Sequence, residues 1–242
     1  MNIVILAGGY GTRLHEKTEK IPKPMVNIGR KPMLFHIIDY YMKFDQKRFI
    51  ICSGYKSNYI KKYMQNKFKG INTSSFLYKD AEIKLFNTGL NTNTGGRIHA
   101  VKEHLDNEFH ITYGDGLSDV DVNSVMKLHS KSKTALTISV GHPTSRFGEV
   151  NIEKNIVKSF NEKPKLSGWI NIGYMFGNRK LFNYLKNDDI FEIDTMNKLI
   201  KESELSAYKH SGNFFPVDNI RDLREANKIY KDKKAFWLWK FL

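Results

Sequence analysis

The sequence predicts an α/β protein in which a mostly parallel central sheet lies between two layers of helices. Short apolar runs alternate with amphipathic stretches along the 242 residues, which is the order of β-α-β-α units. The first apolar run, residues 2–7, leads directly into the glycine-rich residues 8–11. A strand that ends in such a turn is typical of a sheet that binds ligands at the carboxyl ends of its strands.

Strands and helices are expected in alternation through the first half of the chain. Continuous apolar runs favour buried strands, and apolar residues spaced three or four apart favour helices packed on a sheet. We expect strands at residues 2–7, 48–53, 74–78, 108–113 and 134–140, and helices at residues 31–44, 57–68, 97–105 and 121–131.

The rhythm changes after residue 141, where two short runs around residues 153–155 predict a hairpin. We expect strands at residues 147–152, 156–160, 170–176, 205–209 and 214–217, and helices at residues 178–185, 193–203 and 219–231. Because no Pro/Ser-rich linker separates the halves, we expect one domain over residues 1–242. Its parts are residues 1–141, residues 142–232, and an aromatic tail at residues 233–242.

The composition excludes several classes of protein. The sequence contains no run of eighteen apolar residues, so we expect no membrane-spanning helix. We also expect no signal peptide, because a core strand begins by residue 3. The net charge of +14 invites a nucleic-acid partner, but the lysines are scattered without an arginine-rich block, so we expect none. The single cysteine, Cys52, lies in an apolar run, which indicates a buried thiol and fits the reducing cytoplasm.

The glycine loop suggests a nucleoside triphosphate site. Glycine tolerates positive φ and lets bare N–H groups approach phosphate oxygens, and Arg13 and Lys23 follow as cations. The loop matches neither the dinucleotide fingerprint nor a Walker A sequence. An ordinary tight turn is the alternative for the loop alone.

Asp115 and Asp218 each end an apolar stretch and are candidate ligands of Mg²⁺, which prefers oxygen. For Asp218 the alternative is a cap of the helix that begins at Asn219. The histidines show no metal-ligand spacing, so we expect no zinc site, and no Gly-x-Ser-x-Gly sequence supports serine hydrolysis.

Other candidates are weaker and keep their structural alternatives. Gly95, Gly96 and Arg97 form a second glycine loop that binds a base or ribose, or else begins a helix. Lys163 is a phosphate ligand or a solvated loop residue. Glu192 and Asp194 accept sugar hydroxyls or cap a helix. The tail Phe236–Leu242 packs onto its own domain or forms a subunit interface.

Seven motifs occur in the order found in one enzyme family. They are Leu6-Ala7-Gly8-Gly9-Tyr10-Gly11-Thr12-Arg13-Leu14, Pro22-Lys23-Pro24-Met25, Thr94-Gly95-Gly96-Arg97, Thr112-Tyr113-Gly114-Asp115-Gly116, Arg146-Phe147-Gly148, Glu162-Lys163-Pro164 and Asp218-x-x-Arg221-Asp222. From residue 1 to about residue 230, the chain resembles the sugar-phosphate nucleotidyltransferases, or NDP-sugar pyrophosphorylases. Within them it looks most like the glucose-1-phosphate cytidylyltransferases.

The resemblance implies a Rossmann-like nucleotidyltransferase fold whose first half binds the nucleotide and whose second half binds the acceptor. It implies transfer of a cytidylyl group from CTP to a sugar 1-phosphate, giving a CDP-sugar and pyrophosphate with the help of Mg²⁺. It further suggests a role in surface polysaccharide synthesis and a possible homo-oligomer, since family members are often homo-oligomers. The cysteine content and the hydropathy predict a cytoplasmic enzyme without a membrane partner.

The resemblance also assigns roles to individual positions. The catalytic residues are Arg13, Lys23 and Asp115, and the metal ligands are Asp115 and Asp218. The nucleotide-binding residues are Leu6, Ala7, Gly8, Gly9, Gly11, Thr12, Gly95, Gly96 and Arg97. The acceptor-binding residues are Glu162, Lys163, Asn171, Gly173 and Asp194.

Three departures from the family pattern concern the acceptor. Ile172 replaces an expected glycine at the sugar wall, and Asp194 replaces an expected glutamate. The segment at residues 79–89 is shorter than the family pattern leads us to expect. The same chemistry on a heptose phosphate, on a non-sugar phosphomonoester or with another nucleotide is therefore an alternative. A binding or regulatory subunit without activity is a remoter one.

Overall fold

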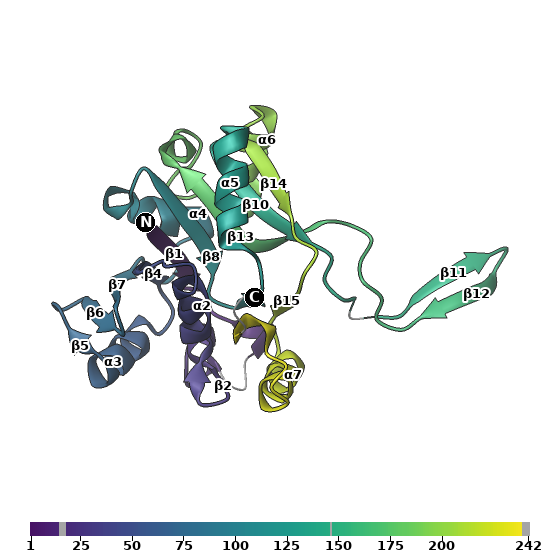
Figure 1. Ribbon diagram of the computed structural model, residues 1–242, viewed down its shortest axis with the longest axis horizontal. Helices are drawn as coiled ribbons and strands as arrows, with labels where there is room; N and C mark the ends of the chain where they lie inside the picture. Colours follow the sequence, from purple (N-terminus) through teal and green to yellow (C-terminus); the bar gives the residue numbers. More distant parts are fainter. Residues whose placement is uncertain (15–17, 146, 239–242) are drawn as a thin grey trace.

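The computed structural model describes residues 1–14, 18–145 and 147–238. The strands of its main sheet are β1 (Asn2–Ala7), β4 (Arg48–Ser53), β5 (Lys69–Gly70), β6 (Ser75–Tyr78), β7 (Ala81–Asn87), β8 (Glu108–Tyr113), β10 (Leu136–Gly141), β13 (Ile170–Asn178) and β14 (Leu205–Lys209). They form a nine-stranded sheet in the order β14-β10-β13-β8-β1-β4-β7-β6-β5 (Figure 1).

The core of the sheet is mostly parallel, whereas its β7-β6-β5 edge is antiparallel. Strands β8, β1, β4 and β7 run parallel to one another, as do β10 and β14. Strand β13 joins these two groups by pairing antiparallel with both β8 and β10. The predicted α/β class with a mostly parallel central sheet is therefore confirmed.

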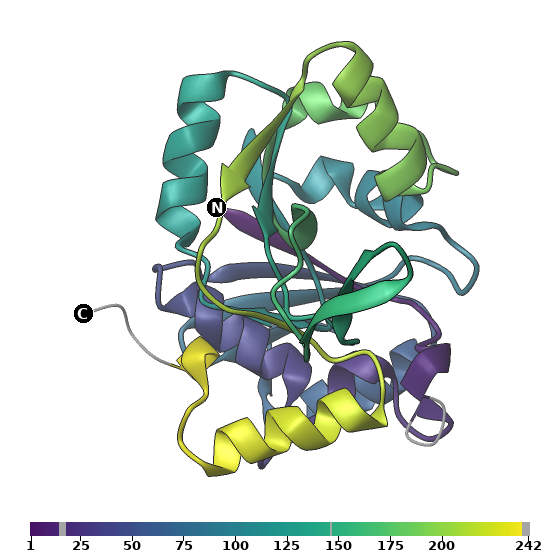
Figure 2. The ribbon, with the colours of Figure 1, turned by 90° about the vertical axis from the view of Figure 1, so that its right-hand side faces the viewer.

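Helices cover both faces of this sheet. They are α2 (Met33–Met42), α3 (Ser57–Lys67), α4 (Thr94–Ala100), α5 (Val122–Ser132), α6 (Met196–Lys201) and α7 (Ile220–Lys231). Figure 2 shows α5 on one side of the strands and α4 and α6 on the other.

The burial of β1 explains the continuous apolar run at the start of the sequence. Ile3 and Ile5 are fully buried in the cluster that contains α2 and α3, whereas Val4 and Leu6 pack in the cluster that contains α4 and α6. Successive side chains of a strand point to opposite faces, so a strand covered on both faces is apolar throughout.

Three two-stranded pairs lie outside the main sheet. They are β2 (Asn27–Ile28) with β3 (Lys31–Pro32), β9 (Gly116–Ser118) with β15 (Phe214–Pro216), and β11 (Glu149–Glu153) with β12 (Ile156–Asn161). The third pair is the predicted hairpin, and Figure 1 shows it projecting far from the rest of the molecule.

The expected elements differ from the structure in a few places. Strand β7 was not expected, because its exposed side alternates Glu82 and Lys84 with buried Ala81, Ile83 and Leu85. The expected helix at residues 97–105 is α4 followed by a 3₁₀ turn, and the one at residues 178–185 is a 3₁₀ turn over Arg179–Asn183. No helix in the described part of the chain has the length and hydropathy needed to span a membrane.

The described part of the aromatic tail packs onto its own domain. Trp237 is 1% exposed, and its Nε1 donates to Nδ1 of His36 at 3.2 Å. Burial lowers the pKa of His36 to about 4, so the ring is neutral near pH 7, and its Nε2 donates to the Ile28 carbonyl at 2.9 Å. Residues 239–242 lie outside the described residues.

We expect Trp237→Ala to lower the free energy of unfolding by about 3–5 kcal/mol, because it removes a large buried ring and leaves a cavity. Leu238→Ala is the matched control, since Leu238 is 39% exposed, and we expect it to cost under about 1 kcal/mol. Urea unfolding followed by circular dichroism measures both values. Equal values for the two variants would contradict the anchoring role of Trp237.

Candidate active site

The glycine loop after β1 is shaped by three glycines with different surroundings. A Cβ at Gly8 would collide with the guanidinium of Arg97, whereas the corresponding position at Gly9 faces open space. Gly11 has a φ of 65°, which favours glycine, and a Cβ there would lie 3.0 Å from side-chain carbons of Thr18 and Lys23. The loop therefore presents bare backbone to a cavity at Gly9.

The buried side chain of Arg97 holds the backbone of this loop at Gly8. Arg97 is buried, with 4% of its surface exposed, and its Nη2 donates to the Gly8 carbonyl at 3.1 Å. Nη1 donates to the carbonyls of Ser53 and Gly89 at 3.1 and 2.9 Å. Burial lowers the pKa of Arg97. Nη1 also donates to the Thr88 hydroxyl at 2.7 Å, so the guanidinium joins the chain at the carboxyl ends of β1, β4 and β7.

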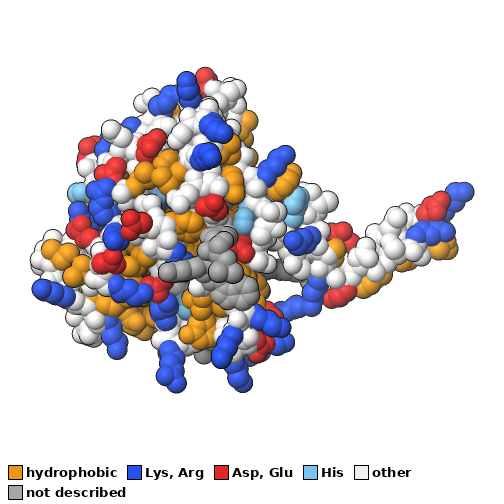
Figure 3. Space-filling view, in the orientation of Figure 1, with side chains coloured by type: hydrophobic (Ala, Val, Ile, Leu, Met, Phe, Trp, Pro, Cys, Tyr) orange, Lys and Arg blue, Asp and Glu red, His pale blue; other side chains and the backbone are white. Residues whose placement is uncertain are grey.

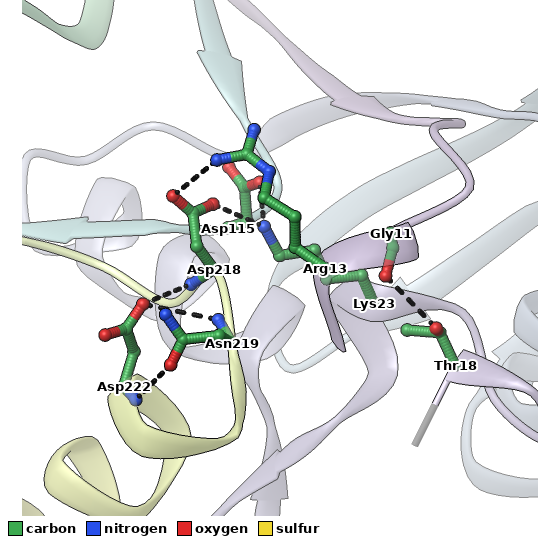
Figure 4. Close-up of polar contacts among 8 residues, drawn as sticks. All are labelled: Gly11, Arg13, Thr18, Lys23, Asp115, Asp218, Asn219 and Asp222. Atoms are coloured by element: carbon green, nitrogen blue, oxygen red, sulfur yellow. Dashed lines mark hydrogen bonds and ion pairs between the residues drawn. The ribbon is translucent and has the colours of Figure 1, made fainter. Parts of the chain in front are cut away.

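Four residues from three distant parts of the chain meet beside the loop (Figure 4). Nζ of Lys23 lies 2.7 Å from Oδ2 of Asp115 and 2.9 Å from Oδ1 of Asp218. Nη1 of Arg13 lies 3.1 Å from Oδ2 of the same Asp218. Two cations and two carboxylates therefore form one connected cluster.

The backbone that carries each member of the cluster is fixed locally. Lys23 begins a 3₁₀ turn between two prolines, and Asp115 follows the end of β8. Asp218 follows β15, and its backbone N–H donates to Oδ2 of Asp222 at 2.9 Å.

Asn219, rather than Asp218, caps α7. The Asn219 side chain accepts from the Asp222 N–H, and the Asp222 carboxylate accepts from the Asn219 N–H, which completes a capping box. The alternative role of Asp218 as the helix cap is therefore wrong, and its carboxylate is directed at Lys23 and Arg13.

The cluster holds Lys23 as a cation. Burial by itself lowers the pKa of Lys23, but the charges and hydrogen bonds of Asp115 and Asp218 outweigh burial and raise the pKa above its usual value. The side chain is 11% exposed. An ammonium that is always charged suits a site that neutralises phosphate.

Two cavities meet at this cluster. The first has a volume of about 190 Å³ and the second about 510 Å³, and Leu6, Gly9 and Asp115 line both. The remaining lining of the first is Ala7, Gly11, Thr12, Arg13, Lys23, Pro24 and Gly114. The first cavity therefore contains every predicted catalytic residue and most of the loop that we expect to bind the nucleotide.

The second cavity is lined by a network of hydroxyl donors around one carboxylate. Thr94 Oγ1 donates to Oε2 of Glu192 at 2.7 Å, and the Tyr113 hydroxyl donates to its Oε1. Burial, followed by the charge of Glu192, raises the pKa of Tyr113, so this hydroxyl stays protonated. Glu192 is thus held as an acceptor at the cavity wall.

Two of the predicted acceptor-binding residues lie behind this wall. The φ of Gly173 is 79°, and a Cβ there would collide with the ring of Tyr113. Its N–H donates to the Asn171 side chain at 3.0 Å, and Asn171 also forms a hydrogen bond with Tyr113. Both residues therefore support Tyr113 from β13.

Ile172 does not shape the sugar wall, so that expectation is wrong. It is 2% exposed and packs in the core, because alternate side chains of β13 point to opposite faces of the sheet.

Several other predicted residues do not line either cavity. A Cβ at Gly95 or Gly96 would collide with the backbone of Asp189 or Asn187, so these glycines allow α4 to pack closely there. Asp194 accepts from the Ile190 N–H at 2.7 Å and borders a different surface cavity.

The hairpin segment carries the remaining predicted residues. Glu162 and Lys163 are neighbours in the sequence after β12, and both are exposed. Nζ of Lys163 lies 3.8 Å from Oε1 of Glu162. Phe147 is 79% exposed, and Arg146 of the same motif lies outside the described residues.

Some residues of the site were not assigned a role from the sequence. Tyr113, Thr94 and Tyr10 line the second cavity, and the Tyr10 hydroxyl donates to Asn91 at 2.7 Å. The position of Tyr113, two residues before Asp115 at the end of an apolar strand, was the available signal for it. For Tyr10 and Asn91, which are 81 residues apart, the sequence offers no signal.

The donor set beside Lys23 fits a divalent cation. Asp115 and Asp218 direct one oxygen each at a common point that the Lys23 ammonium occupies. Mg²⁺ is commonly held by one or two carboxylates together with substrate phosphates. No group of three or more His, Cys, Asp or Glu side chains with metal-binding geometry occurs among the described residues, so substrate phosphates and water would supply the other ligands.

Comparison with known proteins connects this site to a family. The family model described as "Nucleotidyl transferase" matches residues 2–233. A glucose-1-phosphate cytidylyltransferase of Salmonella typhi is 38% identical, with 98% of each chain covered. A D-glycero-alpha-D-manno-heptose 1-phosphate guanylyltransferase of Campylobacter jejuni is 35% identical, with 76% of this chain and 78% of the relative covered.

The fold itself recurs in solved structures. A glucose-1-phosphate thymidylyltransferase, described as putative, from Bacillus anthracis superposes with a TM-score of 0.73 at 20% identity, and 96% of each chain is covered. The predicted resemblance to sugar-phosphate nucleotidyltransferases is confirmed, and the chain belongs to the nucleotidyl transferase family of enzymes.

Proposed function

We propose that this enzyme transfers the cytidylyl group of CTP to glucose 1-phosphate, giving CDP-glucose and pyrophosphate. The observation that carries the proposal is the Lys23 ammonium between Asp115 and Asp218 at the side of the glycine-loop cavity. That arrangement suits phosphoryl transfer, in which positioning and charge neutralisation provide most of the catalysis. The choice of nucleotide and acceptor rests on the likeness to the Salmonella relative.

In the proposed reaction, a phosphate oxygen of glucose 1-phosphate attacks the α-phosphorus of CTP. The bond between the α-phosphorus and the bridging oxygen breaks, and pyrophosphate leaves with the electron pair. The second pKa of a phosphate monoester is about 6, so the nucleophile is already ionised at neutral pH and needs no general base.

Each residue of the cluster then has one task. The N–H groups of the loop around Gly9 bind phosphate oxygens, and Lys23 neutralises charge on the α-phosphate. Arg13, whose exposed fork is held by one bond to Asp218, binds the departing pyrophosphate. Asp115 and Asp218 would hold Mg²⁺, which when bound neutralises charge on the phosphates.

Arg97 has a positioning role in this proposal, because its donors bind three backbone carbonyls and the Thr88 hydroxyl of the protein itself. The second cavity receives the nucleoside or the sugar, with Glu192 as the acceptor for hydroxyl groups. A cytoplasmic location, where CTP and sugar phosphates are made, is part of the same proposal, as is the absence of a nucleic-acid or membrane partner.

Pyrophosphate release with each of the four ribonucleoside triphosphates, Mg²⁺ and a panel of acceptors tests the proposal. The panel contains glucose 1-phosphate, a heptose 1-phosphate and a non-sugar phosphomonoester. We expect release only with CTP and glucose 1-phosphate. Release with GTP and the heptose 1-phosphate, the pair suggested by the Campylobacter relative, would overturn the cytidylyl assignment. No release with any pair would indicate a non-catalytic subunit.

We expect Lys23→Ala to lower kcat by about 100- to 1000-fold, because a buried cation that neutralises transition-state charge is lost. Lys20→Ala is the matched control, since Lys20 is exposed and no contact in the described residues ties it to the cluster. Steady-state kinetics gives kcat, and circular dichroism checks that both variants are folded. An unchanged kcat in Lys23→Ala would exclude Lys23 from catalysis.

We expect Asp218→Asn to raise the Mg²⁺ concentration for half-maximal activity by about tenfold or more, because the neutral amide binds a hard cation poorly. Asp232→Asn makes the same change at an exposed position after α7 and should leave the Mg²⁺ dependence unaltered. Activity measured across a Mg²⁺ titration distinguishes the two. Superimposable curves for Asp218→Asn and the native chain would remove Asp218 from the metal site.

A further inference from the structure

The two carboxylates of the charged cluster lie at one end of the short strand pair formed by β9 and β15. In this antiparallel pair Gly116 lies opposite Pro216. Asp115 directly precedes Gly116, and Asp218 follows Pro216 by two residues. The N–H of Val217 donates to the Asp115 carbonyl at 3.0 Å. The register of β15 on β9 therefore decides where Asp218 stands relative to Asp115.

Strand β9 is fixed to the body of the molecule by two buried tyrosines. The Tyr174 hydroxyl donates to the Gly116 carbonyl at 3.1 Å, and the Tyr40 hydroxyl donates to the Val120 carbonyl at 2.8 Å. Tyr40 and Tyr174 are 1% and 2% exposed. The body of the molecule thus determines the position of Asp115, and the position of Asp218 depends on how β15 is held against β9.

The pair alone is a weak support for β15. It contains three residue pairs, lies outside the main sheet, and ends at Pro216, which has no N–H to donate. The residues of β15 are only partly buried. Because a strand rises by about 3.3 Å per residue, a slip of one residue would move Asp218 by about 3.3 Å. That shift is larger than the 2.9 Å between Asp218 and Lys23, so a slip would break the cluster.

At the other end of the pair, the Asp119 carboxylate binds the segment that leads from β14 into β15 (Figure 1). Its Oδ1 accepts from the Asn213 N–H at 2.6 Å, and its Oδ2 accepts from Nδ2 of Asn213 at 2.7 Å. Nε2 of His210 donates to Oδ1 at 2.9 Å. A Cβ at Gly212 would lie 2.4 Å from this Oδ1, so the glycine lets the segment close over the carboxylate.

Further hydrogen bonds hold this segment, residues 210–213, against its surroundings. The Ser118 hydroxyl donates to the Asn213 carbonyl at 2.7 Å, and the Asp119 N–H donates to the same carbonyl at 3.3 Å. The His210 N–H donates to the Val140 carbonyl of β10 at 2.8 Å. The Asp119 carboxylate therefore connects the end of β9, the edge of the main sheet and the start of β15.

We propose that Asp119 is a positioning residue of the reaction, because it holds β15 in register on β9 and so places the Asp218 carboxylate beside Asp115. Asp119 is not among the described residues that line either cavity of the site, so it acts on the site through Asp218. The inference rests on the proposed function, in which Asp115 and Asp218 hold Mg²⁺.

Asp119→Ala tests the proposal, because it removes the three hydrogen bonds to the carboxylate and lets β15 shift. Mn²⁺ is the probe, and its binding to the full chain with CTP is followed by the relaxation rate of water protons, with CTP alone as background. We expect the Kd of Mn²⁺ to rise about tenfold, as is common when a residue that orients a metal ligand is lost.

Asp121→Ala is the matched control for Asp119→Ala. The Asp121 carboxylate lies two residues further along and caps α5 by accepting from the N–H groups of Asn123 and Ser124. Its loss should lower the melting temperature and leave the Kd of Mn²⁺ unchanged, because α5 does not carry a residue of the cluster.

A second variant separates position from charge. In Asp119→Asn the amide oxygen still accepts from the Asn213 N–H and from His210, and the amide nitrogen donates to the Asn213 side chain once that side chain turns over. Acidic and basic side chains are interspersed over the face seen in Figure 3, so the loss of one charge alters the long-range field little. We expect a Kd within about twofold of the native value. A Kd as high as in Asp119→Ala would assign the effect to charge and overturn the positioning role.

Asn213→Ala decides the question if Asp119→Ala fails to fold. Asn213 is exposed, so this variant loses only the bond from Nδ2 to Oδ2 of Asp119. We expect the Kd of Mn²⁺ to rise at least about twofold, against no change in Ser211→Ala at an exposed neighbouring position. A native Kd in Asp119→Ala or in Asn213→Ala would overturn the positioning role alone. A native chain that holds no Mn²⁺ would overturn the metal site of the proposed function and the positioning role with it.

Discussion

The ion pair of Lys23 with Asp115 and Asp218 is the contact on which the site depends. It joins a turn near the N-terminus, the end of a central strand and the segment before the last helix. Each partner sits on backbone that is fixed independently, by prolines, by β8 and by the capping box of α7. The cluster can therefore form only when all three parts of the fold are in place.

A second constraint shapes the nucleotide cavity. The glycine loop is open to solvent at Gly9, yet its underside is tied by Arg97 to carbonyls from two other loops. These hydrogen bonds order a glycine turn that would otherwise be flexible. The loss of conformational entropy when a phosphate binds is therefore smaller. Rigidity in this region comes from a buried cation rather than from packed apolar side chains.

The sequence was sufficient where chemistry and position coincide along the chain. The apolar runs between amphipathic stretches predicted the sheet. The loop residues, Lys23 and Asp115 could be singled out because each lies at the end of a strand or between prolines, and the structure brings them to one cavity. It was insufficient where a role depends on three-dimensional surroundings. Arg97 reads as a ligand beside a glycine loop, and its burial beneath another loop becomes visible only in the fold. Ile172 likewise lies at an expected wall, but the strand turns its side chain into the core.

The long separation between Lys23 and Asp218 has a consequence for synthesis. These residues lie 195 positions apart, and α7, which fixes Asp218, is the last α-helix of the described chain. During translation, the early strands and the glycine loop emerge first and begin to fold. Asp218 can reach Lys23 only when the segment that carries it, including α7, has left the ribosome. The chain between the two residues then has to close a long loop before the contact forms. A nascent or truncated chain can thus have most of the sheet and still lack the charge arrangement for turnover.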